Sequence, residues 1–181
     1  MSKKIFLIIF LFLFLTPSFV LGKEAGESAK ITYKTILQEV PTLFYKKTAI
    51  RNILKKYQSP LAEFTDSFIQ VCLNYQINCY LLPAIAGVES TFGRYILPYS
   101  FNPFGWGGGQ IVFKNWEEAI EKVGFGIKKN YIDYGLTSIE AIANLYSQNP
   151  NWSKNVWFFI NQFEKEEENL RLYFEKNKVK L

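Results

Sequence analysis

The chain has 181 residues, of which 49% are hydrophobic and 18% aromatic, so it can form one globular domain with a real core. Its net charge is +5, or +3 without Lys3 and Lys4, and no basic cluster is interleaved with aromatic residues, which argues against nucleic acid as a partner. The absence of histidine excludes Ser/His/Asp and Cys/His catalysis and imidazole-bound zinc. Acid–base chemistry must therefore fall to carboxylates, tyrosine or lysine, and we expect no cofactor.

Residues 1–22 have the pattern of a secretory signal. Two lysines precede eleven unbroken apolar residues, Ile5–Leu15, and the small residue Gly22 marks a cleavage position. The alternative is an uncleaved anchor, because residues 5–21 are at the lower limit of a membrane span. Both readings predict an exported protein, located in the periplasm, in the cell wall or outside the cell, which contacts the membrane only through this segment if it is uncleaved.

The remaining chain divides into three regions by composition: 23–58, 59–165 and 166–181. The first begins with a polar stretch and continues as a helical preface, in which apolar residues recur at helical spacing and are interrupted at Pro41. The second has the composition of a folded domain. The third is a charged tail, which we interpret as the solvated end of a helix.

Residues 59–93 contain the signals of two helices. Ser59 can cap the first and Pro60 can begin it. Asn78 can cap the second, and Gly93 can stop it. From Tyr80 to Val88 the second helix has no charged residue, so we expect it to be buried on every side.

Cys72 and Cys79, separated by six residues, flank the predicted turn between these helices. In an exported protein this spacing favours a disulfide that closes the turn. The alternative is two small buried thiols. Two cysteines are too few for a metal cage, and we expect no metal site.

The segment 97–113 predicts a loop followed by a small hairpin. It holds four glycines within five positions, and its end, Ile111 to Phe113, is rich in β-prone residues.

Three more helices follow. Asn115 with Glu118, and Thr137 with Glu140, have the spacing of capping boxes, and Ser153 can cap the last helix. Together these signals predict an all-α fold with one small β-hairpin or loop region.

The residue of greatest chemical interest is Glu89, at the end of the apolar helix. Helical spacing places Leu82, Ile85 and Ala86 on its face, with Phe92 one turn ahead. Burial and the negative end of the helix dipole both raise the pKa of a carboxyl, and a protonated carboxyl is what a general acid requires. The alternative is that Glu89 only marks where the helix emerges into solvent.

Four stretches occur in order: SPLAEFTDSFIQVCLNYQIN, LLPAIAGVESTFG, NPFGWG and TSIEAIANLYSQNPNWSKNVWFFI. With these stretches the chain resembles the lysozyme-like superfamily of bacterial peptidoglycan-cleaving enzymes, most closely its lytic transglycosylase-like and glucosaminidase-like domains. The resemblance covers about Ser59 to Phe163 and is strongest at Glu89 and Ser90. It implies that Glu89 is the catalytic acid of an enzyme that cuts β-1,4 bonds between the amino sugars of peptidoglycan.

The resemblance also implies substrate-binding residues in the glycine-rich stretch FGWGGGQ, where the family has a loop lining the substrate. Sugar rings would approach the backbone at Gly105 and Gly107 and stack on Trp106, whose alternative role is core packing. Asn102 and Gln110 are candidates for hydrogen bonds to N-acetyl groups.

Two further residues carry over from the family. Ser90 resembles a residue that hydrogen-bonds near the catalytic carboxyl, although it could be only a serine at a helix end. Tyr146 falls where transglycosylase-like members have a tyrosine that holds the catalytic glutamate, and its alternative role is in the core. The next residue is Ser147 instead of the family's asparagine, so that substrate contact is not carried over.

The expected mechanism uses one carboxylate. In a lytic transglycosylase the attacking hydroxyl belongs to the muramic sugar, whereas in a hydrolase it is water, usually managed by a second carboxylate. Asp133, Glu117 and Glu121 are the candidates for that second group, and all three fall on solvated faces of their helices. A non-enzymatic wall-binding module of the same fold is the other alternative. We expect a monomer whose partner is the glycan strand.

Overall fold

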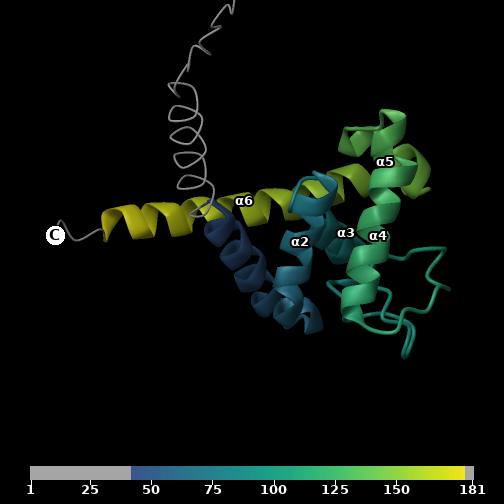
Figure 1. Cartoon of the computed structure of the whole chain (residues 1–181), viewed down its shortest axis with the longest axis horizontal. Coiled ribbons are helices and arrows are strands. Elements are labelled where there is room, and N and C mark those ends of the chain that lie inside the picture. Colours follow the sequence, from purple (N-terminus) through teal and green to yellow (C-terminus); the bar gives the residue numbers. More distant parts are fainter. Residues whose placement is uncertain (1–41, 178–181) are drawn as a thin grey trace, which may run out of the picture. The chain divides into compact units, whose positions relative to one another are not determined.

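The computed structural model describes residues 42–177, so the predicted signal or anchor lies outside the described residues. No helix within this range is both long and apolar enough to cross a membrane. The elements are a helix over residues 42–56, η1 (Pro60–Phe64), α2 (Thr65–Tyr75), α3 (Leu81–Ser90), α4 (Trp116–Asn130), η2 (Ile132–Tyr134), α5 (Ile139–Tyr146) and α6 (Trp152–Lys176). The all-α prediction is confirmed, since residues 42–177 contain no strand (Figure 1).

Helix α3 lies in the core, as its sequence predicts. All seven residues from Leu81 to Gly87 are buried. The helix packs chiefly against α6, the longest helix in Figure 1, while α2 packs against α4. Because α3 has no polar face, it can be accommodated only where neighbours surround it.

The helix over residues 42–56 belongs to the same core. Its residues Ile50 and Leu54 are fully buried in the cluster that contains Ile85 of α3. We predicted that the catalytic domain begins at Ser59, and the structure shows that the helical preface shares that domain's apolar interior. Apolar side chains four residues apart lie on one face of a helix, which is why this face is buried.

Side chains cap three helices, and one cap differs from the prediction. Ser59 caps η1, which begins at Pro60, as predicted, because the Ser59 hydroxyl accepts the Leu61 N–H at 3.0 Å. Asn115 caps α4 as predicted, because its side-chain oxygen accepts the Glu118 N–H at 2.8 Å. The cap of α5 is Ser138 instead of Thr137, since the Ser138 hydroxyl accepts the Ala141 N–H at 3.1 Å. Both residue types can cap, so the sequence did not separate adjacent positions.

Two helix ends also differ from the predictions. Helix α6 begins at Trp152, so Ser153 lies inside its first turn and does not cap it. Helix α3 ends at Ser90, and Thr91 is its left-handed C-cap, with φ of 51°. Gly93, the predicted stop, follows two residues later with φ of 80°. The backbone therefore leaves α3 through a turn that begins at Thr91 and extends to Gly93, and not through a single glycine.

The predicted hairpin is absent. The loop between α3 and α4 is built of turns, and one backbone hydrogen bond, from the Phe113 N–H to the Ser100 carbonyl at 2.8 Å, links its two sides. The apolar side chains of Ile111 and Val112 are exposed. The four glycines have positive φ values and bend the backbone locally, which prevents the extended pairing that a hairpin needs.

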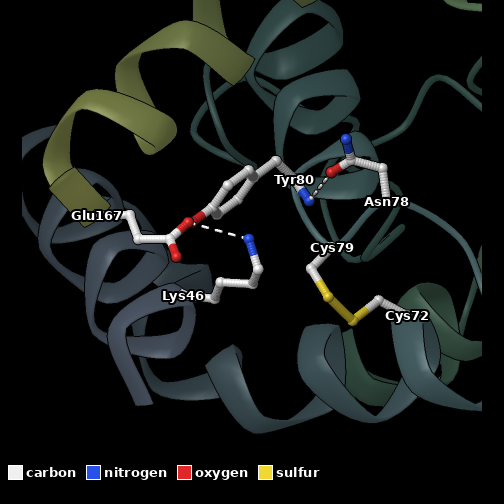
Figure 2. The surroundings of a disulfide bond; sticks show 6 residues. All are labelled: Lys46, Cys72, Asn78, Cys79, Tyr80 and Glu167. Carbon is white, nitrogen blue, oxygen red and sulfur yellow. Dashed lines mark hydrogen bonds and ion pairs between the residues drawn. A yellow bond between two sulfur atoms is a disulfide. The ribbon is translucent and has the colours of Figure 1, made fainter. Parts of the chain in front are cut away.

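Cys72 and Cys79 form the predicted disulfide, which ties the last turn of α2 to the segment before α3 (Figure 2). In that segment the Asn78 side chain accepts the N–H of Tyr80 at 2.8 Å. Asn78 therefore supports the turn before α3 but, contrary to our prediction, is not the cap of the helix, because the N-cap position is Tyr80.

Glu167 on α6 is buried, although we predicted a solvated tail beyond residue 165. Its carboxylate accepts hydrogen bonds from the Tyr80 hydroxyl at 2.6 Å and from Lys46 at 2.9 Å (Figure 2). Arg171 donates a third, at 3.1 Å. Burial alone would raise the pKa of Glu167, but the bonds from Tyr80 and Lys46 and the two positive charges outweigh burial and lower it. This Glu167 cluster joins the 42–56 helix, α3 and α6.

Candidate active site

Glu89 lies in the last turn of α3, where the buried helix reaches an open pocket of about 480 Å³. One carboxylate oxygen, Oε1, accepts a hydrogen bond of 2.7 Å from the indole Nε1 of Trp152. The other oxygen, Oε2, faces Gly105, so close that a Cβ atom on this glycine would be 2.7 Å away. The two oxygens therefore differ, since Oε1 is held by a donor whereas Oε2 has no donor among residues 42–177.

The pKa of Glu89 is raised above its ordinary value of 4.5 because the protein partly encloses the carboxyl. The hydrogen bond from Trp152 acts in the opposite direction, since it stabilises the ionised form, but it does not cancel the effect of burial. Glu89 as a whole residue is exposed to solvent, as expected where the helix emerges from the core. The site therefore combines a carboxyl that holds its proton to higher pH with a donor ready to stabilise the carboxylate.

Trp152 is fixed by its surroundings. Its side chain is almost fully buried, and its ring stacks on Tyr146 with centroids 4.9 Å apart. The Tyr146 hydroxyl in turn donates to the carbonyl of Phe104 at 2.7 Å. Burial raises the pKa of Tyr146 well above its usual range, with a smaller contribution from the charge of Glu89, so this hydroxyl remains a donor. Tyr146 thus supports the indole and the loop, and the indole holds Glu89.

Asn102 organises the glycine-rich loop from inside. It is buried, and its amide donates to the carbonyls of Trp106 at 2.9 Å and Ile111 at 3.0 Å. Its side-chain oxygen accepts the Trp106 N–H at 3.0 Å. We predicted that Asn102 could bind an N-acetyl group, but in this structure its side chain is engaged within the loop.

Three pockets follow one another along this loop. The Glu89 pocket shares Gly105 with a second pocket of about 290 Å³, which is also lined by Trp106, Gly107 and Tyr146. The second pocket shares Trp106 and Ile111 with a third of about 400 Å³. The predicted residues Gly105, Trp106 and Gly107 are thus brought together beside Glu89.

Trp106 packs against the core and also borders the pockets, and its stacking on a sugar stays a prediction. One edge packs on α4 so closely that a Cβ on Gly126 would be 2.5 Å from the indole, and its ring lies 5.9 Å from that of Tyr146. The rest of the ring lines two of the pockets. Gln110, in contrast, is exposed and lines none of these three pockets.

Ser90 does not bond to the Glu89 carboxyl. It is buried, donates to the carbonyls of Pro103 at 2.7 Å and Ala86 at 3.1 Å, and accepts the Gly93 N–H at 2.7 Å. It therefore connects the end of α3 to the two chain segments that border the Glu89 pocket. Ser90 positions the walls of the pocket, although the resemblance implied a contact near the carboxyl.

None of the three acids considered as a second carboxylate lines the Glu89 pocket. Asp133 is paired with Lys128 at 2.6 Å, and that hydrogen bond lowers its pKa. Glu121 accepts from the Tyr75 hydroxyl, and Glu117 is exposed on α4. Among residues 42–177 no group of three or more Cys, Asp or Glu residues is placed to hold a metal ion.

The sequence pattern did not point to Trp152, the only side chain within residues 42–177 that hydrogen-bonds to the Glu89 carboxyl. A signal was present, because Trp152 lies four residues before Val156 and extends the apolar stripe of the last helix by one turn. A buried tryptophan usually finds a partner for its N–H, but the sequence does not say which acceptor is near.

Comparison with protein families finds no family model that matches the chain, and comparison with curated proteins finds no match. The geometry around Glu89 is therefore the main ground for proposing a function.

Proposed function

We propose that the protein is an exported enzyme that cleaves the β-1,4 bonds of peptidoglycan as a lytic transglycosylase. The observation that carries this proposal is the Glu89 carboxyl, which has a raised pKa, is oriented by Trp152, and opens into a pocket that no other carboxylate lines. Such a group can give a proton and later take one back.

In the first step, protonated Glu89 donates its proton to the glycosidic oxygen, and the bond from that oxygen to C1 breaks with both electrons leaving on oxygen. The sugar carbon becomes oxocarbenium-like. Because Trp152 donates to Oε1, the oxygen that faces Gly105, Oε2, is the natural proton carrier. The indole N–H also stabilises the carboxylate that this step creates.

In the second step, the Glu89 carboxylate accepts the proton of the C6 hydroxyl of the muramic sugar as that oxygen attacks C1. The product is a 1,6-anhydro ring, no water is consumed, and Glu89 is protonated again. A hydrolase would need a second carboxylate to activate water or to attack the sugar. The pairing of Asp133 with Lys128, outside the Glu89 pocket, supports the one-carboxylate route.

The test is Glu89→Gln, which keeps the side-chain volume and can still accept from Trp152 but cannot transfer a proton. We expect cleavage of purified sacculi to fall by about 10²- to 10⁴-fold while the protein stays folded and bound to sacculi. Glu117→Gln is the matched control, because Glu117 is exposed and lies outside the Glu89 pocket. Mass spectrometry of wild-type products should show muramic ends that lack one water.

Each other result has a distinct meaning. Full activity of Glu89→Gln would remove Glu89 from the chemistry. Reducing ends that contain the water would identify a hydrolase. Binding of sacculi without any cleavage by the wild-type protein would favour the wall-binding module.

A further inference from the structure

A second charged residue, Arg94, lines the Glu89 pocket. It is the only basic residue there, and its side chain is exposed to solvent. None of the ion pairs within residues 42–177 includes it. The pocket therefore contains one acid, which is the proposed proton donor, and one cation whose charge has no partner in the described chain.

The backbone at Arg94 is held in place next to Glu89. The N–H of Gly93 donates to the Ser90 hydroxyl at 2.7 Å, and the N–H of Tyr95 donates to the Ser90 carbonyl at 3.0 Å. Arg94 lies between these two bonds, which both go to the residue that follows Glu89 in sequence. A change at the end of α3 would therefore move the acid and the cation together.

The side chain of Arg94 is also partly oriented. Its guanidinium lies 5.6 Å from the centroid of the Tyr95 ring, within the range of a cation–π contact. A cation–π contact is not a hydrogen bond, so the N–H groups of the guanidinium can still bind an acceptor. The exposed ring of Tyr95 thus supports a cation that faces the pocket.

Arg94 is not an ion-pair partner of Glu89. A guanidinium in contact with that carboxyl would lower its pKa, whereas the pKa of Glu89 is raised and the one opposing effect is the bond from Trp152. When Glu89 starts the reaction protonated, Arg94 is the only charge on the pocket wall. A ligand with a negative group beside the scissile bond would match this arrangement.

We propose that Arg94 is a specificity residue that binds a carboxylate substituent of the glycan in the Glu89 pocket. This inference rests on the proposed function, because it assumes that the pocket holds a muramic sugar. The carboxylate could belong to the peptide attached to that sugar or, where the peptide has been removed, to the lactyl group, whose carboxyl otherwise forms the amide bond to the peptide. A guanidinium can bind either in a two-pronged, charge-assisted geometry. Arg94 should add nothing to the binding affinity for glycans that lack carboxylates, such as chitin oligomers.

The experiment measures binding in the Glu89→Gln background, so that it does not depend on cleavage. Three ligands are compared: intact sacculi, glycan strands freed of peptide by an amidase, and chitin oligomers. Arg94→Gln should weaken binding of the anionic glycans about tenfold and leave chitin binding unchanged. Arg94→Lys should keep part of the affinity, because it retains the charge but not the planar fork. Lys55→Gln, an exposed change on the 42–56 helix, is the matched control.

The ligands separate the two sources of the carboxylate. A loss with sacculi assigns Arg94 to carboxylates of the peptide, because the lactyl carboxyl of a peptide-bearing sugar is an amide. A loss with peptide-free strands assigns it to the lactyl carboxylate that the amidase frees, and a loss with both means that it binds either group. Equal affinity of Arg94→Gln and its parent for both anionic ligands would overturn the proposal, as would an equal loss for chitin. If the wild-type protein binds these glycans but cleaves none, the enzyme proposal fails while the binding comparison still decides the role of Arg94.

Discussion

The substitution Gly105→Ala tests whether the position of Glu89 Oε2 matters for catalysis. An alanine Cβ would lie 2.7 Å from Oε2, well inside the distance at which carbon and oxygen normally meet. The carboxyl is the end of a flexible side chain, so it can move by about half an ångström, but this strains the Trp152 hydrogen bond. Misplacement of a reacting group by about 1 Å can cost roughly 100-fold, so we expect cleavage to fall by about 10- to 100-fold.

The control for this change is Gly108→Ala. Gly105 and Gly108 have almost the same backbone angle, with φ of 63° and 65°, but a Cβ at Gly108 would meet nothing within 4 Å. Both variants therefore incur the left-handed strain of alanine, about 1–2 kcal/mol, and should lose similar thermal stability. Only Gly105→Ala should lose activity beyond that effect. Equal cleavage rates of sacculi by the two folded variants would refute the assignment of Oε2 as the proton carrier.

Two more variants test the hydrogen bonds of the Glu89 and Glu167 carboxylates. Trp152→Phe removes a hydrogen bond that lowers the pKa of Glu89, so this pKa should rise further. The pH at which the cleavage rate begins to fall should then be higher than in the wild-type protein. A fall at the same or a lower pH would contradict this prediction. Glu167→Gln should lower the unfolding free energy by about 1–2 kcal/mol at neutral pH, because partly exposed Lys46 and Arg171 lose a charged acceptor. The pKa of Glu167 is lowered in the folded state, so this difference in unfolding free energy should shrink as the pH falls from 4.5 through the lowered pKa. Urea titrations at several pH values measure the difference, and a value that does not change with pH would argue against the prediction.

The features that sequence predicted best depend on neighbours along the chain. The burial of α3 follows from an uninterrupted apolar stretch, and the Asn115 cap follows from a three-residue spacing. The disulfide links Cys72 and Cys79 across a single turn, so it is also a local feature. In each case the partners are near enough in sequence for helix geometry to bring them together.

The features that sequence did not predict depend on contacts between distant segments. Sixty-three residues separate Trp152 from Glu89, and their hydrogen bond exists only because α6 packs on α3. Asn102 was read as a substrate ligand because the glycine turns that supply its backbone partners could not be built from the pattern alone. The burial of Glu167 was not predictable either, because its partner Lys46 lies 121 residues earlier in the chain.

The contact between Trp152 and Glu89 also gives the protein an optical signal for its own proton. Indole emission responds to charge near the ring, and the indole of Trp152 is shielded from solvent and bonded to a carboxyl whose pKa is raised. Trp157 provides a contrast, because its N–H bonds to Glu140, and that bond lowers the pKa of Glu140 and keeps it ionised near neutral pH. Changes in the emission of Trp152 can therefore follow the charge of Glu89, without any label, as a glycan enters the pocket.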